Sequence, residues 1–472
     1  TNPSGKILYK NFKINFPTLS ENFSFAFEIN DIALWWTWDL GKQNLYTITI
    51  ESELFPTYET VFGIREVYLD DEENFYLNKK RLFLRGTNII PEQFLSSLTE
   101  KRIQRQVALM REANINAVRI HAHVNRDEYY SELDKAGILV WQDFALQWTY
   151  DESEEFLINA VGQIKEMVRG LYNHPSIAFW CCHNEPGEQV KKLDSYLYDA
   201  VLSEDNSRVV RKASNYEEHA YDGWYWGNKE HYAATPMGPL VTEFGAQALP
   251  ILSTLKKIFP NDNLNKPDWE KWKYHNFQYE QTFNVAKIEM GKSIQDFVKN
   301  SQQYQSDLLH TAINFYRREK SNRINGIFQF MFIDCWDSIT WSVVDYHENP
   351  KLGYHTLKKV YQPLFVSINL RQEIYGDDVP LQIDIWIIND LHIEFKKCKL
   401  IFRINGTQFG EIFINNIAPD AVKFIRYEEI KIPFPKETKN GLHQIDVELY
   451  DSKEEIISTN DFKIELRKRI KG

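Results

Sequence analysis

The sequence predicts a multidomain protein in which a (β/α)8 barrel is flanked by β-sandwich domains. The chain has 472 residues, which is more than one ordinary domain holds. From about residue 69 to 362, short apolar strands alternate with amphipathic helices, and this alternation favours a parallel sheet. About eight such units in roughly 290 residues fit a barrel, which typically needs about 250 residues. On both sides of this region the pattern is β alone.

Residues 1–68 predict an incomplete β-sandwich. Four segments of this region are rich in β-branched and aromatic residues or alternate apolar with polar ones. A complete sandwich has about seven strands, so part of the domain is missing from this stretch. The segments expected to form strands are 6–16, 23–29, 45–54 and 58–69.

The barrel region, 69–362, reveals its elements through periodicity and turn residues. In the helix expected over 99–115, Ile103 and Met110 fall on one face. Gly137 ends the next helix, as glycine commonly does. The expected strands are 81–90, 116–124, 137–144, 176–186, 207–215, 223–227, 239–247 and 325–336, and the expected helices are 99–115, 126–137, 154–173, 295–318 and 350–364. Residues 363–472 alternate with period two and predict a second, C-terminal β-sandwich.

The composition excludes two classes of partner. The net charge is −11 and no basic face is evident, so we expect no nucleic acid to bind. No apolar run approaches the ~20 residues of a membrane span, so we expect no membrane partner. The four cysteines show neither zinc-site spacing nor a disulfide framework. A reducing compartment, and therefore the cytoplasm, fits this cysteine content best.

Two glutamates follow apolar strands of the expected barrel. The segment "IAFWCCHNEP" carries Glu185 at the end of the fourth strand, and "PLVTEFGAQ" carries Glu243 at the end of the seventh. A barrel carries its chemistry at the carboxyl ends of its strands, so these carboxylates face each other across its mouth. Cleavage of a glycosidic bond needs such a pair, one to protonate the leaving oxygen and one to attack the sugar or activate water. Asn184, next to the acid, can donate to a sugar hydroxyl.

Several motifs of the chain resemble glycoside hydrolase family 2, and its β-mannosidase-like branch in particular. The resemblance covers most of the chain and rests on "HNE", "TEFG", "LWWTWDLGKQNLYTI", "FLRGTNIIPEQF", "AGILVWQDF", "HPSIAFWCCHNEP" and "CWDSITWSVVDY". It implies a TIM barrel between immunoglobulin-like β-sandwich domains. It also implies a retaining exo-β-glycosidase, with β-mannosides as the leading substrates and no cofactor or metal. By this resemblance Glu185 is the acid/base, Glu243 is the nucleophile, Asn184 contacts the 2-hydroxyl region and Trp336 is the floor of the sugar subsite.

The chain departs from this family in two respects. His121 stands in "RIHAHV", where β-mannosidases usually have a tryptophan, and Ile89 takes the position of another. The family's N-terminal sugar-binding-like β-domain is also absent from the sequence. We therefore hypothesise a companion polypeptide that supplies the missing domain. A homo-oligomer is a second candidate assembly.

Further polar and aromatic residues lie near the expected strand ends. Arg119 is expected to orient the nucleophile through two hydrogen bonds. Tyr225 is a second candidate to hydrogen-bond the nucleophile. The residues expected to bind substrate are Asn88, Arg119, His121, His123, Asp143, Asn184 and Trp336, with Asp334 as a further candidate. Trp148, Trp224 and Trp226 are expected either as aromatic walls of the cleft or as core residues.

Two alternative functions stay open at the level of sequence. His121 and His123 form a His-x-His pair at a strand end, which is also a ligand pattern of zinc-dependent amidohydrolases. His183 and Asp334 are the further ligands that such a site would recruit. The other alternative is a catalytically dead barrel that binds carbohydrate, which the presence of both Glu185 and Glu243 disfavours.

Overall fold

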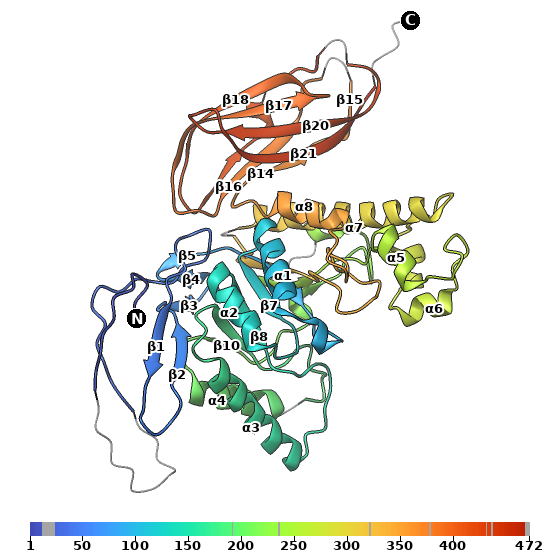
Figure 1. The fold of residues 1–472 in the computed structure, drawn as a ribbon. Coiled ribbons are helices and arrows are strands. Elements are labelled where there is room, and N and C mark those ends of the chain that lie inside the picture. The colour runs from blue at the N-terminus through green and yellow to red at the C-terminus, as the bar shows by residue number, and fades with distance from the viewer. Residues whose placement is uncertain are drawn as a thin grey trace, which may run out of the picture.

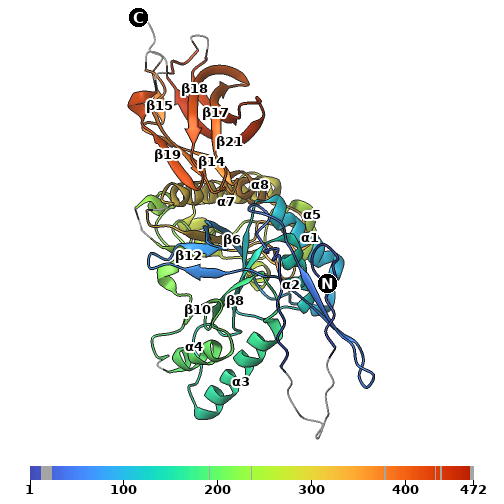
Figure 2. The same cartoon turned by 90° about the vertical axis from the view of Figure 1, so that its left-hand side faces the viewer.

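The protein is described by a computed structural model. It covers residues 1–11, 24–190, 192–234, 237–320, 322–376, 379–430, 432–435 and 438–467. At its centre lies a parallel sheet of eight strands that curls into a barrel, which confirms the expected fold class (Figures 1 and 2). In spatial order the strands are β10 (Val209–Arg211), β9 (Ile177–Cys181), β8 (Leu139–Asp143), β7 (Ala117–Ile120), β6 (Leu84–Ile89), β13 (Gly326–Gln329), β12 (Leu240–Phe244) and β11 (His219–Ala220).

The two faces of the barrel strands pack differently, because successive side chains of a strand point to opposite faces. Inside the barrel, the Trp141 ring stacks on Phe179, with centroids 4.6 Å apart, and meets Phe328 edge-on. Outward-facing residues such as Val118 and Val241 pack with the helices in the largest hydrophobic cluster. The interior below the strand ends is therefore filled, so the polar residues gather at one end.

Helices surround most of the barrel, but not all of it. The helices are α1 (Glu100–Glu112), α2 (Asp127–Ala136), α3 (Glu154–Leu171), α4 (Leu193–Glu204), α5 (Leu252–Ile258), α6 (Trp269–Tyr274), α7 (Ile294–Arg318) and α8 (Leu352–Val360). The Thr99 side chain caps α1, and Gly137 ends α2 with a φ of 71°, as expected. None of the helices among the described residues has the length and apolar character needed to cross a membrane.

The sixth barrel strand differs from the sequence prediction, whereas the fifth, β10, lies within the expected range 207–215. The strand expected at 223–227 is wrong, since these residues form turns. The sixth strand is instead the two-residue β11. Within the described residues, only short helical turns follow β10 and β11, where a regular (β/α)8 barrel has full helices. These and the remaining turns are η1 (Leu95–Ser97), η2 (Tyr216–Glu218), η3 (Lys229–Ala233), η4 (Gln281–Val285) and η5 (Tyr427–Glu429).

The N-terminal region contains fewer strands than expected. Its sheets are the pair β1 (Tyr46–Ile50) and β2 (Tyr58–Phe62), and a small sheet of β3 (Val67–Leu69), β4 (Phe75–Leu77) and β5 (Lys80–Arg81). The strands expected at 6–16 and 23–29 are not formed over 6–11 and 24–29, and residues 12–23 lie outside the described part. A strand needs a neighbour to pair with. Neither segment has a ladder partner among the described residues.

The tryptophan-rich segment at 35–38 joins the N-terminal region to the barrel. Trp35 is buried and donates its indole hydrogen to the Asp134 carbonyl at the end of α2. Trp38 donates to the Ile115 carbonyl, just before β7. Trp35 also belongs to the apolar cluster that fills the lower barrel. The segment therefore closes the end of the barrel opposite the strand carboxyl ends.

The C-terminal region is a β-sandwich, as expected. One of its sheets has β14 (Leu364–Leu370), β16 (Ile383–Asn389) and β19 (Ala421–Ile425), and the other has β15 (Ile374–Tyr375), β21 (Ile456–Leu466), β20 (Gly441–Tyr450), β17 (Phe395–Ile404) and β18 (Thr407–Ile417). It sits against α7 and α8, on the side of the barrel away from α3 and α4 (Figure 1). The buried Asp390 binds Arg85 of β6 at 2.7 Å and Arg317 of α7 at 2.6 Å, which ties the two domains together.

Candidate active site

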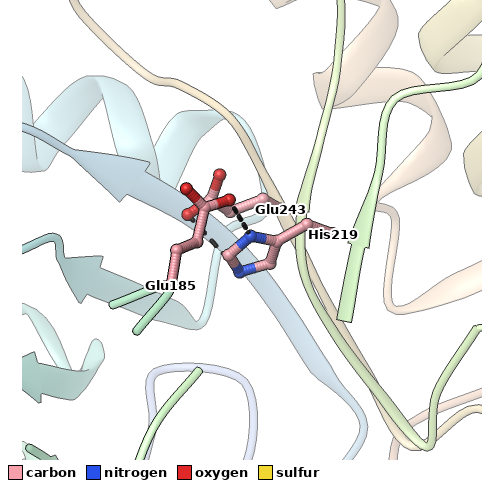
Figure 3. A group of neighbouring side chains, drawn as sticks. All are labelled: Glu185, His219 and Glu243. Carbon is pink, nitrogen blue, oxygen red and sulfur yellow. Dashed lines mark hydrogen bonds and ion pairs between the residues drawn. The ribbon is translucent and has the colours of Figure 1, made fainter. Parts of the chain in front are cut away.

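Polar side chains converge at the carboxyl ends of the barrel strands. Arg119 lies in β7, Asp143 ends β8, Glu243 is the next-to-last residue of β12, and the Asn184–Glu185 pair follows β9. These side chains contact one another directly, as described below. Figure 3 shows the carboxylates of Glu185 and Glu243 close together beside the His219 ring, which contacts both. The structure thus brings together the two glutamates that the sequence analysis singled out.

Glu243 is the deeper of the two glutamates, with its side chain only 5% exposed. Arg119 Nη1 donates to Oε1 over 2.9 Å, and the Tyr221 hydroxyl donates to Oε2 over 2.8 Å. His121 Nε2 lies 3.3 Å from Oε1. Burial alone would raise the pKa of Glu243, but His219, His121 and Arg119 together hold this pKa well below its ordinary value. Glu243 is therefore an anion at any ordinary pH.

Arg119 links several residues of the site. It is fully buried, and its Nε donates to Asp143 Oδ2 over 3.0 Å while Nη2 donates to Asn184 Oδ1 over 2.6 Å. Burial favours the neutral guanidinium, yet the charges of Asp143 and Glu243 outweigh it and raise the pKa of Arg119. The planar guanidinium, with its fixed donors, sets the relative orientation of the three groups. Asp143 is held in turn by the indole of Trp141 at 2.9 Å.

Glu185 is shallower, with 16% of its side chain exposed. His219 Nδ1 lies 2.7 Å from Oε1, and the indole nitrogen of Trp148 donates to Oε2 over 3.0 Å. The backbone at Glu185 has a φ of 49°, in the left-handed region that costs a non-glycine residue about 1–3 kcal/mol. Its N–H donates to the Ser214 carbonyl over 2.8 Å. This contact, from the segment after β10, holds the acidic side chain toward Glu243.

The spacing of the two carboxylates limits what the site can do. One ligand atom from each of Glu185, His219 and Glu243 lies within 4.8 Å of the others. Carboxyl groups about 5–5.5 Å apart suit a covalent, retaining glycosidase, whereas inversion needs about 6.5–9.5 Å. The same three atoms could also hold a metal ion. That trio differs from the His-x-His pair considered from the sequence.

The His-x-His pair does not converge on one point. His121 faces Glu243, whereas Nδ1 of His123 lies 2.9 Å from the His121 carbonyl oxygen. The other ring nitrogen of His123 faces Asn125 at 3.4 Å. Burial lowers the pKa of His123 to about 4, so its ring is neutral. This geometry does not favour the zinc amidohydrolase alternative.

Two of the expected substrate-binding residues make their contacts away from the carboxylates. Asn88 is buried and donates to the Thr242 carbonyl, over 2.9 Å, so it lies beside the strand that carries Glu243. Trp336 stacks on His275, with ring centroids 5.1 Å apart and planes at 18°. The motif around Trp336 does not predict this contact with His275, the residue that follows α6.

Three residues near the carboxylates escaped the sequence analysis. His219 and Tyr221 come from "HAY" at β11, and their spacing of two puts both on one face of a strand. Phe330 follows β13, and its ring lies 5.4 Å from that of His121 and 6.4 Å from that of Tyr221, by centroids. Tyr221, and not Tyr225, donates to the nucleophile candidate, since Gln278 donates to the Tyr225 hydroxyl over 3.3 Å. The alternation in "HAY" was the signal that could have identified the first two.

Comparison with known proteins assigns the chain to a family. The model described as "Glycosyl hydrolases family 2, TIM barrel domain" matches residues 67–268. The model described as "Glycosyl hydrolases family 2" matches residues 2–65. Together they match more than half of the chain, and the sequence resemblance to this family is thereby confirmed.

The chain is also similar to curated β-mannosidases. It is 25% identical to β-mannosidase B of Thermothelomyces thermophilus, over 77% of this chain and 52% of that protein. It is 25% identical to the β-mannosidase of Mus musculus, over 71% of this chain and 46% of the mouse protein. The chain thus spans about half the length of the curated relatives it matches.

Solved structures share the fold at lower identity. The β-D-mannosidase of Dictyoglomus thermophilum superposes with a TM-score of 0.78 at 23% identity, over 93% of this chain and 58% of that one. The exo-chitosanase of Amycolatopsis orientalis gives a TM-score of 0.69 at 18% identity, over 92% of this chain and 55% of that one. By its family models, its β-mannosidase relatives and its fold, this chain is a member of glycosyl hydrolases family 2.

Proposed function

We propose that the protein is a retaining exo-β-glycosidase that removes terminal β-linked sugars, most of all β-mannosides. The observation that carries the proposal is the carboxylate pair, with oxygens of Glu185 and Glu243 within 4.8 Å of each other. The environments of the two differ in the sense that the reaction needs. Glu243 is buried and held as an anion by Arg119 and Tyr221, whereas Glu185 is nearer to solvent.

In the first step, the carboxylate of Glu243 attacks the anomeric carbon of the substrate. The bond between this carbon and the leaving oxygen breaks as an ester bond to Glu243 forms. The proton of Glu185 moves to the leaving oxygen, so that the leaving group departs as a neutral alcohol. Glu185 is then an anion and Glu243 is neutral as its ester.

In the second step, water replaces the departed alcohol. Glu185 takes a proton from this water while the water oxygen bonds to the anomeric carbon, and the ester bond to Glu243 breaks. The sugar leaves, Glu243 is again an anion and Glu185 is again protonated. Each step inverts the anomeric carbon, so the product retains the β configuration.

The neighbouring residues have supporting roles in this proposal. Arg119 and Tyr221 each donate to a different oxygen of Glu243, which fixes the plane of the attacking carboxylate. Asn184 is positioned by Arg119 and contacts a sugar hydroxyl. His121, Asp143, His123, Asn88 and Trp336 remain proposed substrate-binding residues. Of these, His121 has the most direct support, because its ring contacts Glu243.

The preference for β-mannosides draws its support from the relatives, which are named as β-mannosidases. The test is a panel of aryl β-glycosides, namely mannoside, galactoside, glucoside, glucuronide and glucosaminide, each with and without a metal chelator. We expect the aryl group to be released at the same rate with and without the chelator, and fastest from the mannoside. Release abolished by the chelator would instead favour metal chemistry at Glu185, His219 and Glu243. Binding of a sugar without any release would favour the dead-barrel alternative.

We also propose that a companion polypeptide completes the N-terminal sandwich. The domain division at 1–68, 69–362 and 363–472 belongs to this proposal. Exposed apolar side chains in the N-terminal region, Leu8, Tyr9 and Leu54, support it because burying them would stabilise an assembly. Cross-linking of the native protein should give a species with a second, different chain. A species of two identical chains would favour the homo-oligomer, and a monomer would contradict both.

The cytoplasm is the proposed compartment. All four cysteines are free, and Cys181, Cys182 and Cys398 are buried, as suits a reducing environment. Fractionation of the source cells with an antibody against the chain tests this. Recovery of the chain outside the cytoplasmic fraction would contradict it.

A further inference from the structure

We propose that Trp148 forms the leaving-group subsite, where its exposed ring is a platform for a cyclic leaving group. This inference rests on the proposed function, because a leaving group exists only if the protein cleaves glycosides. It goes further in naming the residue that selects what the terminal sugar is attached to. Sequence analysis left Trp148 open as a wall of the cleft or a core residue, and its environment favours the first.

The depths of the two glutamates decide on which side the leaving group lies. Glu243 is 5% exposed and Glu185 is 16% exposed, by side chain. The sugar that is attacked must reach the deeper Glu243, and the leaving oxygen must reach the shallower Glu185. The leaving group therefore extends outward past Glu185. The residue that contacts Glu185 from the solvent side is the one it meets first.

Trp148 is that residue. Its indole N–H donates to Oε2 of Glu185 over 3.0 Å, yet the residue as a whole is 58% exposed. Aromatic rings with one polar edge satisfied and one face open are well suited to hold a sugar or aryl ring. Trp226 is likewise largely exposed, but its ring lies beside that of Tyr225, with centroids 6.1 Å apart. Trp224 is buried and donates to Gln278, so it is a core residue.

The backbone fixes this ring relative to the acid. Trp148 N–H donates to the Asn184 carbonyl over 2.9 Å, and the Gly187 N–H donates to the Trp148 carbonyl over 3.2 Å. The two segments approach so closely that a Cβ on Gly187 would lie 2.4 Å from the Thr149 hydroxyl oxygen. The loops after β8 and β9 therefore hold the acid and the platform as one unit. A ring on this platform is presented to Glu185 in a fixed orientation.

A second exposed ring, that of Tyr216, lies next to the histidine that contacts Glu185. Tyr216 is 59% exposed, and its ring meets that of His219 edge-on, with centroids 6.4 Å apart. His219 in turn contacts the oxygen of Glu185 that Trp148 does not. Partial burial and the charges of Glu185 and Glu243 raise the pKa of Tyr216, which is consistent with a position near both. The acid thus has an exposed aromatic side chain in direct contact and a second one a single residue away, an arrangement that suits a ring-shaped leaving group.

The test must separate the platform from the hydrogen bond to Glu185, because losing either would slow the enzyme. The leaving groups of methyl β-mannoside and of a β-linked mannobiose are both alkyl alcohols. Both substrates therefore need the proton of Glu185 to a similar degree. Only mannobiose carries a ring in its leaving group. The ratio of their kcat/KM values therefore reports the platform alone.

We expect Trp148→Ala to lower this ratio, mannobiose over methyl mannoside, by about 3- to 12-fold, as the loss of a ring-stacking contact implies. Trp148→Phe keeps the ring but not the N–H, so it should lower both values and change the ratio by less than about threefold. Phe413→Ala, at an exposed site on β18, is the control and should change neither value. A ratio unchanged in Trp148→Ala would overturn the proposal, whether or not both values fall.

A binding measurement separates failure of this inference from failure of the proposed function. In the Glu243→Gln variant, the indole N–H resonance of Trp148 is identified by its absence in the double variant with Trp148→Phe. We expect this resonance to shift when mannobiose is added, and to shift less with methyl mannoside. A shift confined to other resonances would overturn the platform while leaving sugar binding intact. No shift of any resonance, together with no release from the aryl glycosides, would contradict the proposed function itself.

Discussion

Tyr221 donates its hydroxyl hydrogen to Oε2 of Glu243 over 2.8 Å. Burial and the charge of Glu243 raise the pKa of Tyr221 well above its ordinary value, so the phenol stays protonated and can only donate in this contact. With Arg119 on Oε1, each oxygen of the buried carboxylate thus has its own donor. In the proposed reaction, one of these donors must release its oxygen when the ester forms.

The Tyr221→Phe variant tests this contact. It removes one hydrogen bond to a charged group and leaves the ring contacts in place, so we expect the fold to be kept. Hydrogen bonds to charged groups are worth about 1.5–3 kcal/mol, which corresponds to roughly a 10- to 150-fold fall in kcat/KM. Steady-state kinetics on an aryl glycoside measures the change. Tyr225→Phe is the matched control and should have a much smaller effect, because its hydroxyl contacts Gln278.

The fall in kcat/KM on loss of Glu185 should depend on the leaving group of the substrate. We expect Glu185→Gln to slow hydrolysis of a poor leaving group, such as an alkyl alcohol, by about 10²–10⁴-fold, since general acid catalysis contributes that much. An activated nitrophenyl leaving group needs little proton donation and should be slowed far less in its first step. The two first-step rates are compared by kcat/KM. Equal losses on both substrates would mean that Glu185 is not the acid.

The ionisation of Glu243 should persist at low pH. Its pKa in the folded protein lies well below the ordinary value of 4.5, although burial alone would raise it, because His219, His121 and Arg119 favour the anion. His121→Asn removes one of these groups and should move the acid limb of the kcat/KM profile to higher pH. His355→Asn, at an exposed position on α8, should leave the limb where it is. An unmoved limb in His121→Asn would contradict this source of the ionisation.

The same depression of the Glu243 pKa has a consequence for stability. The pKa is lower in the folded than in the unfolded chain, so ionised Glu243 contributes to stability above the ordinary value of 4.5. That contribution is lost as the pH falls from 4.5 toward the folded pKa. The free energies of unfolding of the wild type and of Glu243→Gln should therefore become more similar as the pH falls below 4.5. A difference independent of pH would contradict the linkage.

The buried Asp390 should be important for the stability of the joint between barrel and sandwich. It binds Arg85 at 2.7 Å, Arg317 at 2.6 Å and Lys320 at 3.0 Å. Burial alone would raise its pKa, but these three cations lower it to about 2. Asp390→Asn removes the carboxylate that the described residues place beside the buried Arg317, and should cost about 3–5 kcal/mol in the free energy of unfolding. Urea denaturation measures this, with the exposed Asp71→Asn as control, and equal midpoints for the two variants would contradict it.

Much of the site could be predicted from the sequence, because its strands are distinct. Glu185 closely follows a run of five buried strand residues, and Glu243 lies near the end of another. The alternation of strand and helix therefore located both at the barrel mouth. Arg119 and Asp143 were found in the same way. Long, fully buried strands leave a clear apolar signal in the sequence.

The parts that escaped prediction leave a weaker signal. His219 lies in a strand of two residues and Tyr221 directly follows it, so the alternation in "HAY" is too short to stand out, and the aromatic run "GWYWG" nearby imitated a strand. The strands expected in 6–11 and 24–29 had the right residue types but lack a sheet neighbour among the described residues. Strand propensity describes the fit to a sheet, and a segment without a partner strand does not follow it.

The most direct test of the central claim is to trap the glycosyl-enzyme. In a 2-deoxy-2-fluoro-β-mannosyl fluoride, the fluorine at carbon 2 slows both steps of the reaction. The fluoride at the anomeric carbon is a good leaving group, so the first step still proceeds. The second step has no such help, so the covalent intermediate accumulates. Mass spectrometry of the digested protein then shows which peptide carries the added sugar. The account predicts one added sugar on the peptide that contains Glu243, and none in Glu243→Gln. Turnover of an aryl β-mannoside by a protein that is labelled at another residue would contradict it.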